Sequence, residues 1–187
     1  MFVRRWMSSP AVALPADTLL QDALRFMEGR RIRHIAVSLP GGGTGIVTTN
    51  DLHRSLALGD LYLGRGRRRL GDLLPEQPFS VHPDLPVERA VEMMLLNGVT
   101  GLPVVEGGRL VGLVTASDVF RAFTYVMGVC ESGARLSLNA PDKETLLEDI
   151  QEKSRGLVIR SLIACPSPQG GLEVVMRVRG RKGISAA

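Results

Sequence analysis

The sequence predicts an α+β fold in which a duplicated β-α-β-β-α unit is followed by a small β-α-β-β domain. The main observation is internal repetition, because a shift of 67 residues places residues 23–54 on residues 90–121 without a gap. Nine aligned pairs are identical, against about two expected from ordinary residue usage. The identical pairs are Ala23/Ala90, Met27/Met94, Val37/Val104, Gly41/Gly108, Gly45/Gly112, Val47/Val114, Thr48/Thr115, Asp51/Asp118 and Arg54/Arg121.

Apolar spacing predicts the same elements in both copies. Four apolar residues per copy recur at i, i+3, i+4 and i+7, which gives a helix one apolar stripe. These residues are Leu20, Ala23, Leu24 and Met27 in the first copy and Val87, Ala90, Val91 and Met94 in the second. Short apolar segments bounded by turn residues predict strands at 11–14, 32–38 and 45–48, and at 79–82, 102–106 and 110–115.

Two further expectations follow from the repeat. Aligning Pro15 with Pro83 leaves one extra residue in the first copy before Ala23. A unit of this size cannot bury both faces of a three-stranded sheet, so we expect the two copies to pack against each other.

After about residue 128 the pattern changes. Alternation predicts strands at 134–139, 157–164 and 172–178, the last two forming a hairpin. Asp142 opens a helix that Gly156 ends. We expect Leu146, Leu147 and Ile150 to face inward from the helix, and Val174, Met176 and Val178 to share one face of the last strand.

Composition excludes several classes of protein. With 44% apolar and 22% charged residues, the chain is typical of a soluble globular protein. It has neither an apolar run of membrane length nor the apolar segment of a signal peptide, so we expect a cytoplasmic protein without a membrane partner. Its cysteines and histidines lack metal-ligand spacing, so we expect no metal. No constellation suits nucleophilic or acid–base catalysis, so we expect no enzyme activity.

The excess of basic residues raises the question of whether the chain binds nucleic acid. The net charge is +4, and basic residues cluster at 65–69 (RGRRR) and at 177–182 (RVRGRK). Aromatic residues make up only 4% of the chain, which leaves little stacking surface for single strands. We interpret the clusters as a solvated linker and a solvated tail, with phosphate or partner binding as the alternative.

A short motif follows the last strand of each copy. It reads Gly-Ile-Val-Thr-Thr-Asn-Asp-Leu from residue 45 and Gly-Leu-Val-Thr-Ala-Ser-Asp-Val from residue 112. Thr-x-x-Asp alone is typical of a helix capping box. However, a helix N-terminus also attracts phosphate, and an acid beside it can accept hydrogen bonds from ribose hydroxyls. Because the motif recurs at equivalent places, we favour a nucleotide site.

This duplicated unit resembles a pair of CBS domains. That family carries the pattern G-h-h-[T/S]-x-x-D-h, preceded by a strand of the type G-[V/I]-x-x-L-P-V-V. The second copy reads Gly-Val-Thr-Gly-Leu-Pro-Val-Val from residue 98, whereas the first reads Arg-Ile-Arg-His-Ile-Ala-Val-Ser from residue 31, with Ala36 replacing the proline. The resemblance spans about residues 5–125. It implies a regulatory protein that binds AMP, ADP or ATP, or in some members NAD or S-adenosylmethionine, in two clefts.

The resemblance also implies site residues. Thr48 and Asp51 would serve one cleft, and Thr115 and Asp118 the other. Arg33 would reach a phosphate in one cleft, and Thr100 occupies the equivalent position in the other. The adenine would contact backbone at Ala11, Val12, Phe79 and Ser80, and side chains at Ile32 and Val99. Since the clefts differ, we expect at most one to bind tightly, the one with Thr115 and Asp118. Among these compounds, AMP or ATP is the expected ligand.

The β-α-β-β order of the last part resembles the front of an ACT domain, and the whole resembles the acetoin-utilisation B-like proteins. The expected division is 1–60 for the first motif, 61–128 for the linker and second motif, and 129–187 for the ACT-like domain with its basic tail. The resemblance implies a homodimer and a regulated protein partner whose identity the sequence leaves open. A nucleic-acid-binding regulator and a structural dimerisation adaptor remain the alternatives.

Overall fold

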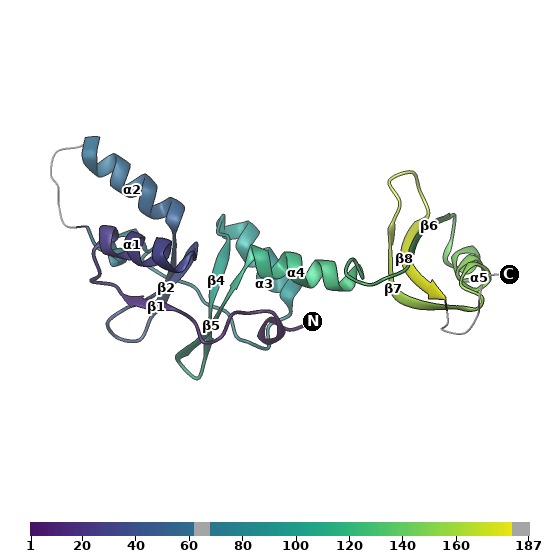
Figure 1. Cartoon of the computed structure of the whole chain (residues 1–187), viewed down its shortest axis with the longest axis horizontal. Coiled ribbons are helices and arrows are strands. Elements are labelled where there is room, and N and C mark those ends of the chain that lie inside the picture. Colours follow the sequence, from purple (N-terminus) through teal and green to yellow (C-terminus); the bar gives the residue numbers. More distant parts are fainter. Residues whose placement is uncertain (62–67, 181–187) are drawn as a thin grey trace. The chain divides into compact units, whose positions relative to one another are not determined.

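The computed structural model describes residues 1–61 and 68–180, which fold into two compact units. The first unit comprises Met1–Val119 and contains the duplicated sheets; the second comprises Phe120–Ala187. Figure 1 shows the elements of each. Of the helices in the described ranges, none has the length and apolar content that a membrane span requires.

The first copy forms the predicted β-α-β-β-α unit. Its elements are β1 (Ala13–Pro15), α1 (Leu20–Arg30), β2 (His34–Ser38), β3 (Thr44–Thr48) and α2 (Thr49–Leu61). The strand order is β1-β2-β3, with β1 parallel and β3 antiparallel to β2. The apolar stripe of α1 packs on this sheet, as its spacing predicts, and its residues Leu20, Ala23 and Met27 are buried.

The second copy repeats this arrangement with a shorter first strand. Its elements are α3 (Val87–Asn97), β4 (Gly101–Glu106), β5 (Arg109–Thr115) and α4 (Ala116–Val126). The strand predicted at 79–82 is reduced to one residue, Val81, which forms a parallel bridge to Val104. The prediction of a full strand there is therefore wrong in extent, because only the centre of the segment reaches β4.

Each copy completes the hydrophobic core of the other, through two short 3-10 helices that the sequence did not reveal. The helix η1 (Val3–Arg5) precedes the first copy but places Val3 in the core of the second. The helix η2 (Leu70–Leu73) precedes the second copy but places Leu70 in the core of the first. Val3 and Leu70 are both fully buried and 67 residues apart, so the exchange is part of the repeat.

Backbone hydrogen bonds correct the predicted register. The Val3 N–H donates to Leu85 O at 2.9 Å, and the Leu70 N–H donates to Thr18 O at 2.9 Å. The first strands agree, since Leu14 pairs with Val37 and Val81 with Val104. Every one of these pairs is related by the same 67-residue shift. The extra residue predicted between Pro15 and Ala23 is therefore wrong, because the two prolines are not structural equivalents.

The glycine that opens each Thr-x-x-Asp motif is required by this exchange. A Cβ on Gly45 would lie 2.5 Å from Leu74 Cδ2, and a Cβ on Gly112 would lie 2.7 Å from Met7 Sδ and 2.9 Å from Ser8 O. Met7 and Leu74 are again 67 residues apart, and each follows the exchanged 3-10 helix. The motif glycines thus leave room for the segment that arrives from the other copy.

The second unit contains the predicted β-α-β-β order: β6 (Ala134–Ala140), α5 (Lys143–Lys153), β7 (Leu157–Pro166) and β8 (Leu172–Gly180). β8 lies between β6 and β7, antiparallel to both. Asp142 caps α5 by accepting a hydrogen bond from the Thr145 N–H at 2.8 Å. One face of β8 is buried as predicted, through Val174, Met176 and Val178.

One side chain of α5 departs from the prediction. Leu146 packs in the core and Ile150 packs against it, but Leu147 is 59% exposed. The prediction that Leu147 faces inward is wrong because this three-stranded sheet contacts only a narrow stripe of the helix.

The exchange of 3-10 helices predicts a strong effect of truncating Leu70. Leu70→Ala should lower the free energy of unfolding by about 2–5 kcal/mol, because it removes a fully buried side chain from the first core. Chemical denaturation followed by circular dichroism measures this change. Leu147→Ala, at a position 59% exposed on α5, is the control and should change stability by less than about 0.5 kcal/mol. Equal effects of the two substitutions would contradict the exchange.

Candidate functional site

The Thr-x-x-Asp motif of the first copy folds as a capping box. Thr48 ends β3, and α2 begins at the next residue. Asp51 Oδ2 accepts hydrogen bonds from the Thr48 N–H at 2.9 Å and from the Thr48 hydroxyl at 2.6 Å. Thr48 Oγ1 accepts from the Asp51 N–H at 3.2 Å. Among the residues with described side chains, nothing bonds to Asp51 Oδ1, so this oxygen can accept from a ligand hydroxyl.

The carboxylate of the second motif accepts the same two hydrogen bonds but is more deeply buried. Asp118 Oδ2 accepts from the Thr115 N–H at 2.7 Å and from the Thr115 hydroxyl at 2.8 Å. Asp118 is only 4% exposed, whereas Asp51 is half-buried. The two carboxylates therefore differ in their access to a ligand.

Both helix starts use a further donor internally. The Thr49 N–H donates to Arg33 O at 3.1 Å, and the Ala116 N–H donates to Thr100 O at 2.9 Å. These residues are again equivalent in the repeat. Because such bonds occupy N–H groups that a phosphate would need, the geometry supports sugar binding by the acid more strongly than phosphate binding at the helix end.

His34 joins the two copies at this place, a role that sequence reasoning missed because it considered this residue only as a metal ligand. His34 Nε2 lies 2.8 Å from Thr100 Oγ1, a hydrogen bond whose direction depends on the imidazole tautomer. Its equivalent in the second copy is Gly101. A Cβ on Gly101 would lie 2.9 Å from Ile46 Cδ1 and 3.2 Å from His34 Cδ2. The small residue in one copy therefore makes room for the imidazole of the other.

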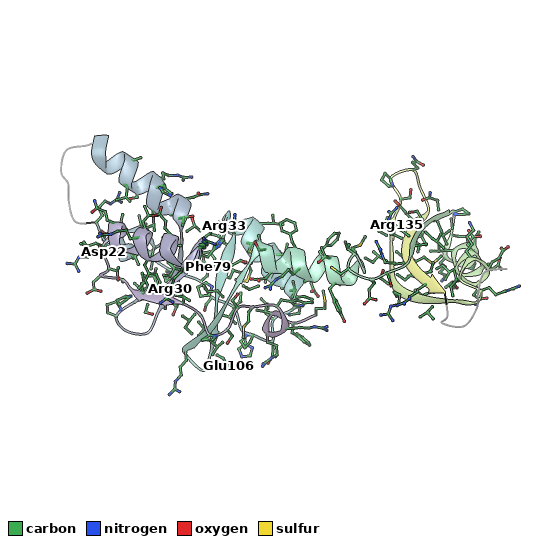
Figure 2. The ribbon with its side chains drawn as sticks, in the orientation of Figure 1. Asp22, Arg30, Arg33, Phe79, Glu106 and Arg135 are labelled. Atoms are coloured by element: carbon green, nitrogen blue, oxygen red, sulfur yellow. The ribbon has the colours of Figure 1, made fainter. Side chains whose placement is uncertain are left out.

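The surroundings of His34 combine opposing charges. Burial lowers the pKa of the His34 imidazole below its ordinary value of 6.5, and the Arg33 guanidinium acts in the same direction. The carboxylates of Asp118 and Asp51 act against this shift. His34 is thus within electrostatic range of the acids of both copies. Figure 2 shows the neighbouring side chain of Arg33, which is exposed, in the region where the two copies meet.

The side chains predicted to contact the adenine are divided between the two copies of the first unit. Val12 and Ile32 pack against the first core, and Phe79 and Val99 pack against the second. Val12 O already accepts a hydrogen bond from the Ala36 N–H at 3.1 Å. The corrected register makes Val12 the equivalent of Phe79, whereas Ala11 and Ser80 have no such counterparts among the predicted site residues. Ala11 is half-buried and Ser80 is exposed.

The basic clusters lie partly outside the described residues. Residues 65–67 and 181–182 fall outside them. Arg68 donates to Ser55 Oγ at 2.6 Å, and Arg69 donates to Asp17 O at 3.2 Å. Arg177 donates to Glu131 O at 3.1 Å. Three of the clustered arginines therefore hold the chain's own fold rather than extend freely into solvent.

One histidine does meet acidic residues, contrary to the argument from sequence spacing. The ligand atoms of His82, Asp84 and Glu106 lie within 4.8 Å of one another, because the end of β4 brings Glu106 to the turn that carries the other two. Figure 2 labels Glu106. Arg4 donates to Asp84 Oδ1 at 2.5 Å and to Glu106 Oε1 at 3.5 Å. A guanidinium therefore already bridges the two carboxylates of this cluster.

The lowered pKa of His34 predicts a pH-dependent contribution to stability. Because the folded pKa is below the unfolded value of 6.5, the unfolded state binds more protons and stability is lost as the pH falls below about 6.5. His34→Gln removes this titration, so its unfolding free energy should fall less between about pH 7 and pH 5 than that of the wild type. His53→Gln, at an exposed position on α2, is the control. Identical pH profiles for His34→Gln and wild type would contradict the assignment.

Comparison with known proteins identifies the duplicated unit. The model of the CBS domain family matches twice, at residues 3–58 and 70–125. These bounds differ by 67 residues and include both exchanged 3-10 helices. Inosine-5′-monophosphate dehydrogenase of Korarchaeum cryptofilum is 29% identical over 117 residues, covering 62% of this chain and 21% of that protein. L-aspartate semialdehyde sulfurtransferase of Methanocaldococcus jannaschii is 25% identical over 123 residues, covering 65% and 23%. The chain thus matches about a fifth of each relative's length.

Solved structures share the same fold. The CBS domain pair of protein MJ0100, in complex with 5′-methylthioadenosine and S-adenosyl-L-methionine, is 24% identical with a TM-score of 0.56, covering 66% of this chain and 95% of that one. A Vibrio cholerae protein described as an acetoin utilization protein, AcuB, is 24% identical with a TM-score of 0.60, covering 71% and 98%. The matched motifs cover more than half of the sequence, and the protein belongs to the CBS domain family as a tandem pair.

Proposed function

We propose that the CBS pair binds an adenosine-containing ligand between its two copies and acts as a non-catalytic regulatory module. The observation that carries this proposal is the matched pair of acid-bearing helix starts, Thr48 with Asp51 and Thr115 with Asp118. The hydrogen bond between His34 of the first copy and Thr100 of the second places polar side chains where the two copies meet, which favours a polar ligand site at that junction.

The sugar is the part of the ligand that this arrangement suits best. Asp51 uses one carboxylate oxygen for the cap, and among the described side chains nothing bonds to Oδ1, which can accept hydrogen bonds from neighbouring ribose hydroxyls. Arg33 is exposed and directly precedes His34, so its guanidinium is the group that we propose to meet a phosphate of the ligand. AMP and ATP therefore fit the Arg33 side, whereas a cationic sulfonium ligand would not benefit from it.

The two clefts should differ in their affinity for the ligand. The sequence favoured the cleft of Thr115 and Asp118, whereas burial gives the opposite order of access, with Asp51 the more open acid. Binding at Asp118 would require local opening before a ribose could reach the carboxylate. One tight site per chain is the expected stoichiometry.

Calorimetric titration tests the proposal directly. The panel is AMP, ADP, ATP, NAD, S-adenosylmethionine and 5′-methylthioadenosine, with GMP as the control for the adenine ring. At least one adenosine compound should bind with a stoichiometry near one per chain, and GMP should bind more weakly. No measurable heat and no thermal shift with any adenosine compound would contradict the proposal.

Asp51→Asn separates the capping role from ligand binding. The asparagine carbonyl can still accept the Thr48 hydrogen bonds, but its amide cannot accept from a ribose hydroxyl. Affinity for the adenosine ligand should fall about tenfold or more, as expected for losing hydrogen bonds to a charged group. Stability should change little. Asp118→Asn is the matched control, and a loss of affinity confined to that variant would assign the ligand to the other cleft.

The C-terminal unit is the proposed output of this module. Its order β6-α5-β7-β8 is that of the front part of an ACT domain, and we extend the resemblance to its role as an interaction domain. Both outer strands, β6 and β7, have one edge without a partner strand among residues 120–180. An open strand edge is a common place for pairing with another chain.

Homodimerisation through the CBS pair is part of the proposal. Leu95 and Leu96 on α3 are 77% and 80% exposed, and Phe120 and Phe123 on α4 are 68% and 57% exposed. Their equivalents in the first copy are Glu28, Gly29, His53 and Leu56, so the apolar exposure belongs to the second copy. A second copy of the chain is the partner that would cover such helices.

Phe123→Glu tests the dimer. The substitution places a charge in the expected contact, so analytical ultracentrifugation should show a shift from dimer to monomer relative to wild type. Glu148→Ala on the exposed side of α5 is a control that should leave the dimer intact. A monomeric wild-type protein at tens of micromolar would contradict the homodimer.

A further inference from the structure

The second sheet has one face covered by α5 and one face that carries arginines. Alternation along β8 places Met176 and Val178 on the covered face and Arg177 and Arg179 on the other. The register pairs Arg177 with Arg135 on β6, which is exposed and lies on the side of the sheet away from α5 (Figure 2). Like charges directly opposite each other repel, so this face carries positive charge that the sheet itself does not balance.

A β-bulge adds an arginine from the third strand. On β7, Ile159 pairs with Val178 and Ser161 pairs with Arg177, which leaves Arg160 as an extra residue. A bulge changes where the neighbouring side chains point. Here Arg160 reaches the side of Arg177, because both arginines bond to the same residue of the segment before β6. The set that we call the arginine row consists of Arg135, Arg160, Arg177 and Arg179.

The segment before β6, residues 127–133, lies against one end of this row, and we call it the strap. Arg160 donates to Glu131 Oε2 through Nε at 3.1 Å and through Nη2 at 2.7 Å, and Arg177 Nη1 donates to Glu131 O at 3.1 Å. The Ser161 hydroxyl donates to Met127 O at 3.1 Å. The sheet thus supplies the donors, and a peptide supplies carbonyl and carboxylate acceptors.

Two glycines allow the strap to lie this close to the sheet. A Cβ on Gly128 would lie 2.8 Å from Ser161 Oγ, and a Cβ on Gly133 would lie 2.3 Å from Val178 O. The strap therefore demonstrates, within this chain, that a peptide backbone can lie in direct contact with this face.

The strap neutralises only part of the arginine row. Glu131 is its single acidic residue. Arg177 Nε is buried and has no hydrogen-bond partner among the residues with described side chains, which is unfavourable for a donor. Arg135 and Arg179 make no hydrogen bond or ion pair with those residues. Glu173, the other acid of this face, lies four residues from Arg177, about 13 Å along β8.

The contact between Arg160 and Glu131 can be exchanged at little cost. Their side chains are 41% and 43% exposed, and ion pairs this exposed contribute little to stability. A carboxylate from another chain can therefore replace Glu131 on Arg160 while the sheet stays folded.

We infer that the arginine row is a docking surface for an acidic peptide segment of a protein partner, and that the strap is the chain's own occupant of one end of it. The inference rests on the interaction role proposed above for the C-terminal unit, whose partner it describes chemically, but not on ligand binding by the CBS pair.

The dimensions of the row suit an extended acidic peptide. Adjacent strands lie about 4.8 Å apart, and side chains i and i+2 of an extended peptide lie about 7 Å apart. Two or three acidic residues within about five positions therefore span the three strands. Nucleic acid fits this face less well, because its alternate positions at 135–139, 161–165 and 173–179 include no aromatic side chain on which a base could stack.

Fluorescence anisotropy of a labelled hexaglutamate peptide tests the surface on the full chain. Wild type should bind hexaglutamate, and should bind hexaglutamine and hexathymidylate more weakly. Arg135→Gln and Arg160→Gln should each weaken hexaglutamate binding by about twofold to fivefold, as expected for one exposed ion pair. Arg155→Gln removes an exposed arginine of the same unit outside the row, and should change the affinity by less than about 1.5-fold at physiological salt.

Glu131→Gln tests whether the strap competes with the peptide. It removes the internal carboxylate, so hexaglutamate affinity should rise by about twofold to fivefold. Glu148→Gln on α5 changes the net charge equally and should alter the affinity by less than about 1.5-fold. Circular dichroism of each variant verifies that the fold is retained.

The inference is overturned if hexaglutamate does not bind wild type, or if the variants of the row behave like their controls. Tighter binding of hexathymidylate with the same dependence on Arg135 and Arg160 would also overturn it, because the face would then serve nucleic acid.

Titration of the same samples with AMP separates this inference from the proposed function. Arg160→Gln should bind AMP as wild type does, because the arginine row is not part of the nucleotide site. Hexaglutamate binding without AMP binding would count against AMP as the ligand of the CBS pair and leave the docking surface standing. AMP binding without hexaglutamate binding would overturn the docking surface alone.

Discussion

The exchange of two 3-10 helices is the packing constraint on which the rest of the first unit depends. Val3 enters the core of the second copy and Leu70 that of the first, so neither copy has a complete core alone. The segment after the first 3-10 helix passes Gly112, where a Cβ would lie less than 3 Å from Met7. The segment after the second passes Gly45, where a Cβ would lie less than 3 Å from Leu74. The same glycines open the Thr-x-x-Asp motifs. The same two glycines therefore serve both the packing of the two copies and the motifs that start the two helices.

The repeat is nearly symmetric in its backbone and asymmetric in its chemistry. In both motifs the Asp carboxylate accepts from the Thr hydroxyl, and the first helical N–H donates to the residue that precedes a strand. However, the first copy supplies Arg33 and His34 where the second supplies Thr100 and Gly101. A side chain at Gly101 would meet Ile46 Cδ1 at 2.9 Å and the His34 imidazole at 3.2 Å, so there is no room for a second histidine there. Different charge and burial at the two acids are the physical basis for expecting one dominant ligand site.

Sequence reasoning predicted the element order of both units and the two capping motifs, because these depend on local patterns of apolar spacing and of side-chain acceptors. It failed where the outcome depends on contacts between distant segments. The 3-10 helices carry too few apolar residues to show a period, and matching Pro15 with Pro83 hid the true register. His34 was missed because its significance lies in Thr100, 66 residues away. Likewise Glu106 meets His82 only through the β4 strand. Leu147 fits a helical stripe, but the narrow sheet does not cover it.

The central claim is that the CBS pair binds an adenosine compound through Asp51. Mass spectrometry of small molecules released from protein purified under native conditions tests it without choosing a ligand in advance. The account predicts an adenosine-containing compound in amounts approaching one per chain, and its depletion from Asp51→Asn purified in parallel. Recovery of no such compound from wild type, together with failure of the apo protein to take one up from a nucleotide extract, would contradict the claim and leave the two motifs as helix caps.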